Sequence, residues 1–129
     1  MHDDPPARAR PHREFFRVDL ASGWTRAPSS AGTIDERVIV DSFDPERRRG
    51  SRTRLVRWSA GARLSQAVVH AWSEDVFIVE GDLVVGCDAD GLGGEAFGPY
   101  TFATRPPGIV HGPFASRGGC VMLETQYYE

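Results

Sequence analysis

The sequence contains no lysine, because all 15 of its basic side chains are arginine. This absence excludes a Schiff-base lysine and the lysine of a phosphate-binding P-loop. A G-x-S-x-G motif is also lacking, so a serine hydrolase of that type is not expected. Cysteine is scarce, and Cys87 and Cys120 are too far apart to form a C-x-x-C pair. We expect two reduced thiols, and the sequence alone leaves a disulfide between them open.

Long apolar runs are missing as well, and none approaches the ~20 residues that a membrane-spanning helix needs. The N-terminal stretch MHDDPPARARPHR has no apolar core, so it does not resemble a secretory signal. The formal net charge of -3 gives no indication of a nucleic-acid surface. We therefore expect a cytoplasmic protein with neither a membrane nor a nucleic acid as its partner.

The length of 129 residues, with 40% hydrophobic and 26% charged side chains, suits one globular domain. Residues 1–13 are rich in Pro, Arg and Asp, and we expect a flexible tail there. Residues 14–129 are expected to form a single domain. In this part no stretch keeps a 3.6-residue apolar period over three turns, which argues against helices.

Short runs rich in Val, Ile, Phe, Tyr and Thr follow one another between turn signals such as Asp44-Pro45 and Glu80-Gly81-Asp82. This pattern is typical of an all-β sandwich or barrel. The predicted strands are Glu14–Leu20, Arg37–Val40, Thr53–Ser59, Leu64–Ala71, Val76–Glu80, Leu83–Cys87, Phe97–Ala103 and Gly119–Tyr127.

Two of the four histidines, His70 and His111, lie in the body of the chain, beside turn-rich sequence where functional residues commonly occur. His70 is followed four residues later by Glu74 and then by Gly81 in a predicted hairpin turn. His111 follows a Pro-Pro-Gly turn that ends at Gly108. Two distant segments therefore each carry a candidate ligand at the end of a strand.

These two segments resemble the two sequence motifs of the cupin superfamily, over roughly residues 53 to 127. In the first motif the glycine matches Gly81, the glutamate matches Glu74 and the second histidine matches His70. The second motif, P-x-G-x-x-H, matches Pro106, Gly108 and His111, although its final asparagine falls on Ala115. The resemblance implies a cupin-type β-barrel, that is, a double-stranded β-helix or jelly roll, and a metal site in its mouth.

This sequence departs from the first motif at one ligand, because Val68 stands where the first histidine belongs. The remaining set of His70, Glu74 and His111 is the ligand set of open iron(II) oxygenase sites. Such a site binds one divalent metal ion, with iron the first expectation and zinc, manganese or nickel as alternatives. Gln66 lies two residues before Val68 and is expected on the same strand face, as a weak oxygen ligand or a partner of metal-bound water.

The resemblance is strongest to two kinds of small cupin: dioxygenases of diketones or hydroxyketones, and the cupin domain of a zinc-binding anti-sigma factor. We therefore expect His70, Glu74 and His111 to act catalytically in a metal-dependent dioxygenase of a small dicarbonyl or hydroxyketone. The alternatives are a non-catalytic module that senses a small ligand or metal, and a metal-independent isomerase that uses the same residues in acid–base chemistry.

Aromatic side chains of the predicted strands are expected in the barrel core or the pocket wall. Trp72 is the preferred lining residue because it follows His70 closely, and Tyr100 and Phe102 are further candidates. Glu124 and Tyr127 on the last predicted strand are possible acid/base groups, with packing roles as the simpler expectation. A homodimer is expected through the edge of the predicted strand Glu14–Leu20, which would bury Phe15 and Phe16.

Overall fold

The computed structural model describes residues 4–129, and every regular element within that range is a β-strand. The all-β class predicted from the sequence is therefore confirmed. In chain order these strands are β1 (Thr25–Ala27), β2 (Ile34–Asp41), β3 (Ser51–Trp58), β4 (Arg63–Leu64), β5 (Ser73–Gly81), β6 (Leu83–Val85), β7 (Glu95–Phe97), β8 (Phe102–Arg105), β9 (Phe114–Ala115) and β10 (Cys120–Tyr127).

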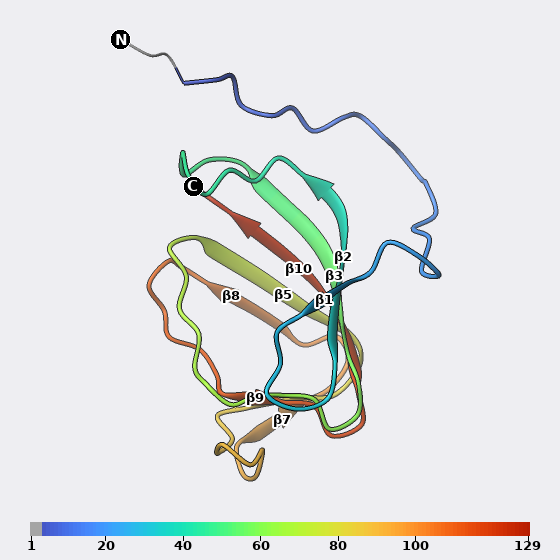
Figure 1. The fold of residues 1–129 in the computed structure, drawn as a ribbon, viewed down its shortest axis with the longest axis vertical. Coiled ribbons are helices and arrows are strands. Elements are labelled where there is room, and N and C mark those ends of the chain that lie inside the picture. Colours follow the sequence, from blue (N-terminus) through green and yellow to red (C-terminus); the bar gives the residue numbers. More distant parts are fainter. Residues whose placement is uncertain (1–3) are drawn as a thin grey trace.

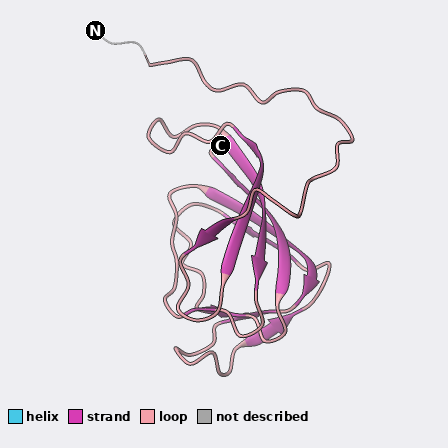
Figure 2. Ribbon diagram, turned by 45° about the vertical axis from the view of Figure 1, so that its right-hand side comes forward, coloured by secondary structure: helices cyan, strands magenta, loops and turns pink. Residues whose placement is uncertain are grey.

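The strands form two antiparallel sheets, one of six strands and one of four (Figure 1). The larger sheet has the order β1-β2-β3-β10-β5-β8, and the smaller has the order β4-β9-β6-β7. The last strand, β10, therefore lies in the middle of the larger sheet, between β3 and β5. Figure 2 shows the larger sheet curving around the interior, with the short strands of the smaller sheet at one end of it.

Alternation along β10 determines which side chains face the interior, because successive residues of a strand point to opposite faces. Cys120, Met122, Glu124 and Gln126 are buried, whereas the residues between them are partly or fully exposed. Met122 lies opposite Val56 of β3 on one side and Ile78 of β5 on the other. The apolar half of this inward face forms the core, and its polar half faces the site described below.

The core is built from both sheets, with β3, β5 and β10 as its main contributors. Its larger ring systems are Trp58 and Phe114, which meet edge to face with their centroids 6.5 Å apart. The other buried members of this cluster are Ile34, Val56, Ala62, Val76, Ile78, Leu83, Cys120 and Met122. Cys87 and Cys120 are both buried and free, as expected for reduced thiols.

Three predicted strands were wrong in whole or in part. Glu14–Leu20 is not a strand, and Phe15 has a left-handed φ of 51°, which interrupts an extended backbone. Only the beginning of Leu64–Ala71 is extended, in β4. The predicted strand Phe97–Ala103 is split into β7 and β8 by a turn in which Tyr100 has a φ of 67°.

Residues 4–24 contain no strand and run along the outside of the barrel before β1 begins (Figure 1). The Arg8 side chain donates to the carbonyl oxygen of Phe43, and Arg49 donates to that of Pro5, so this stretch contacts the loop between β2 and β3. The predicted tail boundary at residue 13 stays a prediction, and its residues 1–3 lie outside the described part. No helix in the described chain is long and apolar enough to cross a membrane.

Candidate metal centre

A cavity of about 440 Å³ opens between the two sheets, and it is large enough for a small organic ligand. Most of its wall is apolar. The apolar lining residues are Ala27, Pro28, Ile34, Val56, Trp58, Leu64, Val68, Val76, Leu83, Phe114 and Met122. The polar lining residues are Glu36, Arg54, His70, Glu74, Arg105, His111 and Glu124. The polar groups therefore occupy a minority of the wall.

Three of these polar side chains converge at one place. Glu74 is the second residue of β5, His70 lies in the segment before β5, and His111 lies in the loop between β8 and β9. Glu74 Oε2 is 3.9 Å from His70 Nε2, and Glu74 Oε1 is 3.9 Å from His111 Nε2. One ligand atom from each residue can be chosen so that all three lie within 4.8 Å of one another.

Backbone hydrogen bonds hold the two histidine segments together. Val68 N donates to His111 O over 2.7 Å, and His111 N donates back to Val68 O over 2.8 Å. Gly108 N also donates to His70 O over 2.9 Å. The turn before His111 is therefore fastened to the segment that carries His70, which brings the two imidazoles to a centroid distance of 5.1 Å.

The His111 ring has a defined tautomer. Its Nδ1 lies 3.1 Å from the carbonyl oxygen of Ile109, and a carbonyl can only accept, so Nδ1 carries the hydrogen. In the neutral ring, Nε2 then keeps its lone pair, and this atom faces Glu74. A histidine that ligates a metal through one ring nitrogen usually donates a hydrogen bond from the other, as Nδ1 does here.

The His70 ring lies against Trp72, with the ring centroids 4.7 Å apart and the planes within 10° of parallel. Burial lowers the pKa of His70 below its ordinary value, and although Glu74 opposes this, the neighbouring His111, Arg54 and Arg105 act with burial. A neutral imidazole is the form that binds a metal ion. Trp72 belongs to an aromatic group that also contains Phe43 and Tyr128.

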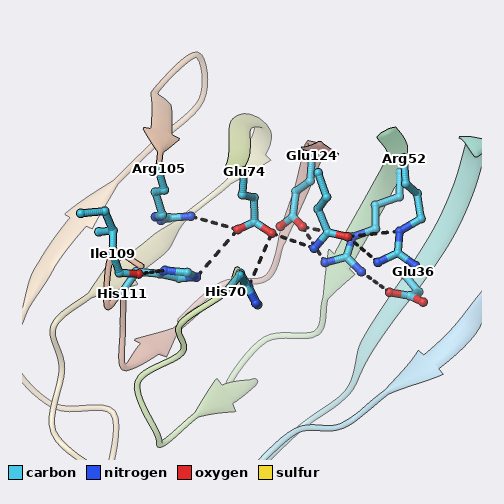
Figure 3. Close-up of polar contacts among 10 residues, drawn as sticks. Glu36, Arg52, His70, Glu74, Arg105, Ile109, His111 and Glu124 are labelled. Atoms are coloured by element: carbon cyan, nitrogen blue, oxygen red, sulfur yellow. Dashed lines mark hydrogen bonds and ion pairs between the residues drawn. The ribbon is translucent and has the colours of Figure 1, made fainter. Parts of the chain in front are cut away.

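The Glu74 carboxylate is oriented from both sides (Figure 3). Arg105 Nη1 donates to Oε1 over 3.3 Å, and Gln126 Nε2 donates to Oε2 over 2.9 Å. The Gln126 amide is oriented in turn by Arg52, whose Nε donates to Gln126 Oε1 over 3.1 Å. Because a guanidinium can only donate, Gln126 must turn its oxygen to Arg52 and its NH₂ group to Glu74.

A second polar group continues along the same wall (Figure 3). Arg54 Nε and Nη2 donate to Glu124 Oε1 over 3.2 and 2.9 Å, and Arg54 Nη1 donates to Glu36. Burial raises the pKa of Glu124 above its ordinary value, and Glu74 adds to the increase, while Arg54 opposes both. Glu124, one of the possible acid/base residues of the sequence analysis, thus lies in the cavity.

The donor set fits a divalent metal ion. Two atoms that each ligate one ion at about 2.1 Å lie at most about 4.2 Å apart, and each imidazole is 3.9 Å from a Glu74 oxygen. The three ligand atoms together lie within 4.8 Å of one another, so a small closing of the set would complete the ligation. The separations of 3.9 Å are also too long for a hydrogen bond, so the imidazoles and the carboxylate do not satisfy one another. The His111 tautomer and the double support of Glu74 prepare the same atoms for a cation.

Among the expected lining residues, Val68 lines the cavity and Trp72 lies behind His70. Gln66, Tyr100 and Phe102 do not line it, and this corrects the sequence-based expectation. Gln66 is exposed in a loop because the predicted strand around it does not form. Tyr100 and Phe102 are 80% and 58% exposed. Phe102 begins β8, in which exposed residues alternate with half-buried ones, and it is on the exposed side.

Several site residues were missed by the sequence analysis, namely Glu36, Arg52, Arg54, Arg105 and Gln126. A signal for one of them existed, because Gln126 shares the inward face of β10 with Met122. Polar residues that continue an apolar face of a strand are candidates for a site. The arginines gave no comparable signal, since each is one of 15 in a chain without lysine.

Comparison with known proteins gives likenesses of structure only. No family model matches the sequence, and no curated protein matches it. The structure of an acetylacetone dioxygenase from Acinetobacter johnsonii is similar with a TM-score of 0.67 and 19% identity, over 96% of this chain and 80% of that one. An RmlC-like cupin from Shewanella frigidimarina has a TM-score of 0.63 and 14% identity, over 92% of this chain and 93% of that one.

A chain in the Rhodobacter sphaeroides complex of SigE with the anti-sigma ChrR is also similar, with a TM-score of 0.57 and 16% identity. The match covers 84% of this chain and 50% of that one. Identities this low establish a common fold and leave the activity undetermined. They agree with the two antiparallel sheets and with the resemblance that the two sequence motifs carry. This protein has the cupin fold.

Proposed function

We propose that the protein binds one divalent metal ion through His70, Glu74 and His111 and acts as a dioxygenase on a small dicarbonyl or hydroxyketone. The observation that carries the proposal is the convergence of two imidazoles and one carboxylate at the polar wall of a largely apolar cavity. Iron(II) is the preferred ion because two histidines and one carboxylate are typical of open non-haem iron sites. The same donors also accept zinc, manganese or nickel.

The ion would supply Lewis acidity toward the substrate oxygens and redox chemistry with dioxygen. The protein's own residues have separate tasks. Arg105 and Gln126 hold the Glu74 carboxylate in one orientation, and the hydrogen bond to Ile109 holds His111 in one tautomer. Apolar side chains such as Val76 and Phe114 exclude water and favour a compact organic substrate.

The acetylacetone dioxygenase from Acinetobacter johnsonii supports this reaction class, because it shares the fold over nearly the whole of this chain. At 19% identity its substrate does not transfer to this protein. The specific support remains the chemistry of the cavity, in which metal-type ligands face an apolar chamber of about 440 Å³.

Elemental analysis of protein purified without a chelator or a nickel column tests the ligand assignment. We expect near-stoichiometric metal in the wild type and loss of that metal in His111→Ala, because one of three ligands is removed. His12→Ala is the matched control, because the His12 side chain is 83% exposed and does not line the cavity. Full metal occupancy in His111→Ala contradicts the proposed ligand set.

Oxygen consumption by the iron(II)-loaded protein, measured with a panel of diketones and hydroxyketones, tests the reaction. Uptake that requires both the metal and one class of substrate supports the dioxygenase. Tight ligand binding without oxygen uptake supports a second candidate, a non-catalytic sensing module. That candidate is favoured by the likeness to a chain of the SigE complex with anti-sigma ChrR.

Activity that survives a chelator would instead support the metal-independent isomerase considered from the sequence. The cytoplasmic location and the homodimer stay predictions. The edge strand Glu14–Leu20 that was expected to carry the dimer contact does not form, so only that part of the expectation is corrected. Sedimentation of the purified protein measures the oligomeric state.

A further inference from the structure

Glu124 has one carboxylate oxygen that the described residues leave without a hydrogen bond. Both guanidinium N–H groups that reach Glu124 come from Arg54, and both end on Oε1. Residues 4–129 provide no hydrogen-bond donor to Oε2. Glu124 is nevertheless only 7% exposed and lines the cavity. Its side chain keeps 10% of its surface accessible, so this oxygen is open to a donor from a ligand or a water molecule in the cavity.

The register of the sheet relates Glu124 to the candidate metal centre. Gln126 lies opposite Glu74, and Glu124 lies opposite Val76, which is the next inward residue of β5. Two positions along a strand correspond to ~7 Å. Glu124 is therefore one side-chain row away from Glu74, along the wall of one cavity (Figure 3). A small molecule can span this interval.

We infer that Glu124 is a ligand-binding residue whose free oxygen accepts a hydrogen bond from a hydroxyl group of the substrate. The inference rests on the proposed function, because the dicarbonyl end of that substrate is the part assigned to His70, Glu74 and His111. It narrows the substrate class to small dicarbonyl or hydroxyketone compounds with a hydroxyl group away from the chelating oxygens.

The charges of the cavity favour a hydroxyl over an ammonium group. Three carboxylates, on Glu36, Glu74 and Glu124, face two guanidinium groups, on Arg54 and Arg105, and leave one net negative charge. A divalent ion at the histidines reverses this to one net positive charge, which a monoanionic enolate neutralises. With the charges balanced in this way, the part of the ligand that contacts Glu124 should be a neutral hydrogen-bond donor. Arg54 opposes the rise that burial and Glu74 give the Glu124 pKa, and in the ionised carboxylate the free Oε2 can only accept a hydrogen bond.

Titration calorimetry with the zinc-loaded protein tests the inference, because zinc has no redox chemistry to consume the ligand. The probes are derivatives of pentane-2,4-dione that carry one hydroxyl group at increasing distance from the dicarbonyl, each paired with its methyl ether. A hydroxyl can donate to Glu124, whereas the ether oxygen cannot. For at least one pair we expect the wild type to prefer the hydroxyl compound about tenfold or more, as a hydrogen bond to a charged group provides.

Glu124→Gln reverses the hydrogen-bond polarity, because the amide turns its oxygen to Arg54 and offers N–H groups to the ligand. The preference should fall to near unity in this variant. Glu46→Gln is the matched control, because the Glu46 side chain is 84% exposed and does not line the cavity, so this variant should keep the preference. Glu124→Asp keeps the charge but withdraws the carboxylate by one methylene, so this variant should also lose the preference. It takes the place of Glu124→Gln if that variant does not fold.

An unchanged preference in both Glu124 variants, or no preference in the wild type, overturns the inference. Failure of the proposed function gives a different result, because it appears as metal that His111→Ala does not remove or as no oxygen uptake. Zinc binding without a hydroxyl preference removes only the Glu124 assignment.

Discussion

At the scale of single residues, the carboxylate of Glu74 is the best supported group of the candidate site. Arg105 and Gln126 each donate to a different oxygen, and Arg52 orients the Gln126 amide from behind. Glu74, Gln126 and Arg105 are largely buried, so water cannot readily replace the hydrogen bonds between them. If Glu74 ligates a metal as proposed, Gln126 is a positioning residue that acts on that metal through Glu74.

The first prediction concerns this positioning. Gln126→Leu removes the donor to Glu74 and the acceptor for Arg52, and we expect zinc affinity to fall by about 10- to 100-fold, as for other partners of ligating residues. Competition with a chromophoric chelator measures the affinity. Gln66→Leu is the matched control, because Gln66 is exposed outside the cavity and should have no effect. Equal affinities of the two variants would refute the role of Gln126.

The second prediction concerns Cys120. Burial raises the pKa of its thiol to about 11, because the thiolate is poorly solvated in the core. The folded protein therefore holds less thiolate at pH 8 than the unfolded chain, whose thiol has an ordinary pKa near 9. In a Cys87→Ser background we expect iodoacetamide to react much more slowly with the folded protein than with the protein in urea. Similar rates in the two states would contradict this assignment.

At the scale of elements, the turn between β5 and β6 depends on a glycine. Gly81 has a φ of 81°, and a Cβ added to it would lie 2.0 Å from the carbonyl oxygen of Gly119. The obstacle is backbone, so it cannot rotate away as a side chain would. Gly81 pairs with Cys120, so a disturbance here reaches the end of the central strand β10.

The third prediction separates conformational strain from steric overlap at this turn. Gly81→Ala and Gly61→Ala both place alanine at a φ of 81°, but a Cβ at Gly61 has no neighbour within 4 Å. We expect Gly61→Ala to lower the free energy of unfolding by about 1–2 kcal/mol through the left-handed backbone alone. Gly81→Ala should lower it clearly more, because Gly119 must also move. Urea denaturation measures both, and equal losses would show that the overlap is relieved without cost.

At the scale of the whole molecule, the candidate ligands come from both sides of β5 in the sequence and meet only when the barrel closes. A metal ion held by all three should therefore bind the folded protein far better than the unfolded chain. Such selective binding stabilises the fold by mass action.

The fourth prediction follows from this linkage. Zinc at 100 times its dissociation constant should raise the free energy of unfolding by about 2.7 kcal/mol in the wild type. Thermal unfolding with and without zinc measures the increase. In His111→Ala the same zinc concentration should give little increase, whereas His12→Ala should respond as the wild type does. An equal increase in His111→Ala would assign the stabilising ion to another place.

Much of the fold could be predicted because its signals are local. Strand-forming composition between turn signals predicted strands at Thr53–Ser59 and Gly119–Tyr127, close to the observed β3 and β10. The glycine of Glu80-Gly81-Asp82 marked the turn after β5. The predictions failed where apolar residues found no partner strand. Glu14–Leu20 and most of Leu64–Ala71 have strand-like composition, but an extended segment is stable only when a neighbour takes its hydrogen bonds.

The sequence by itself determined that the chain is all-β and that His70, Glu74 and His111 stand at motif positions, because turn residues and side-chain alternation act over a few neighbouring residues. Only the tertiary structure decided what surrounds these three. Arg52 meets Gln126, and Arg54 meets Glu124, because β10 pairs with β3 across more than half of the chain. Which residues lie opposite one another in a sheet depends on strand order and register, and no local pattern encodes either.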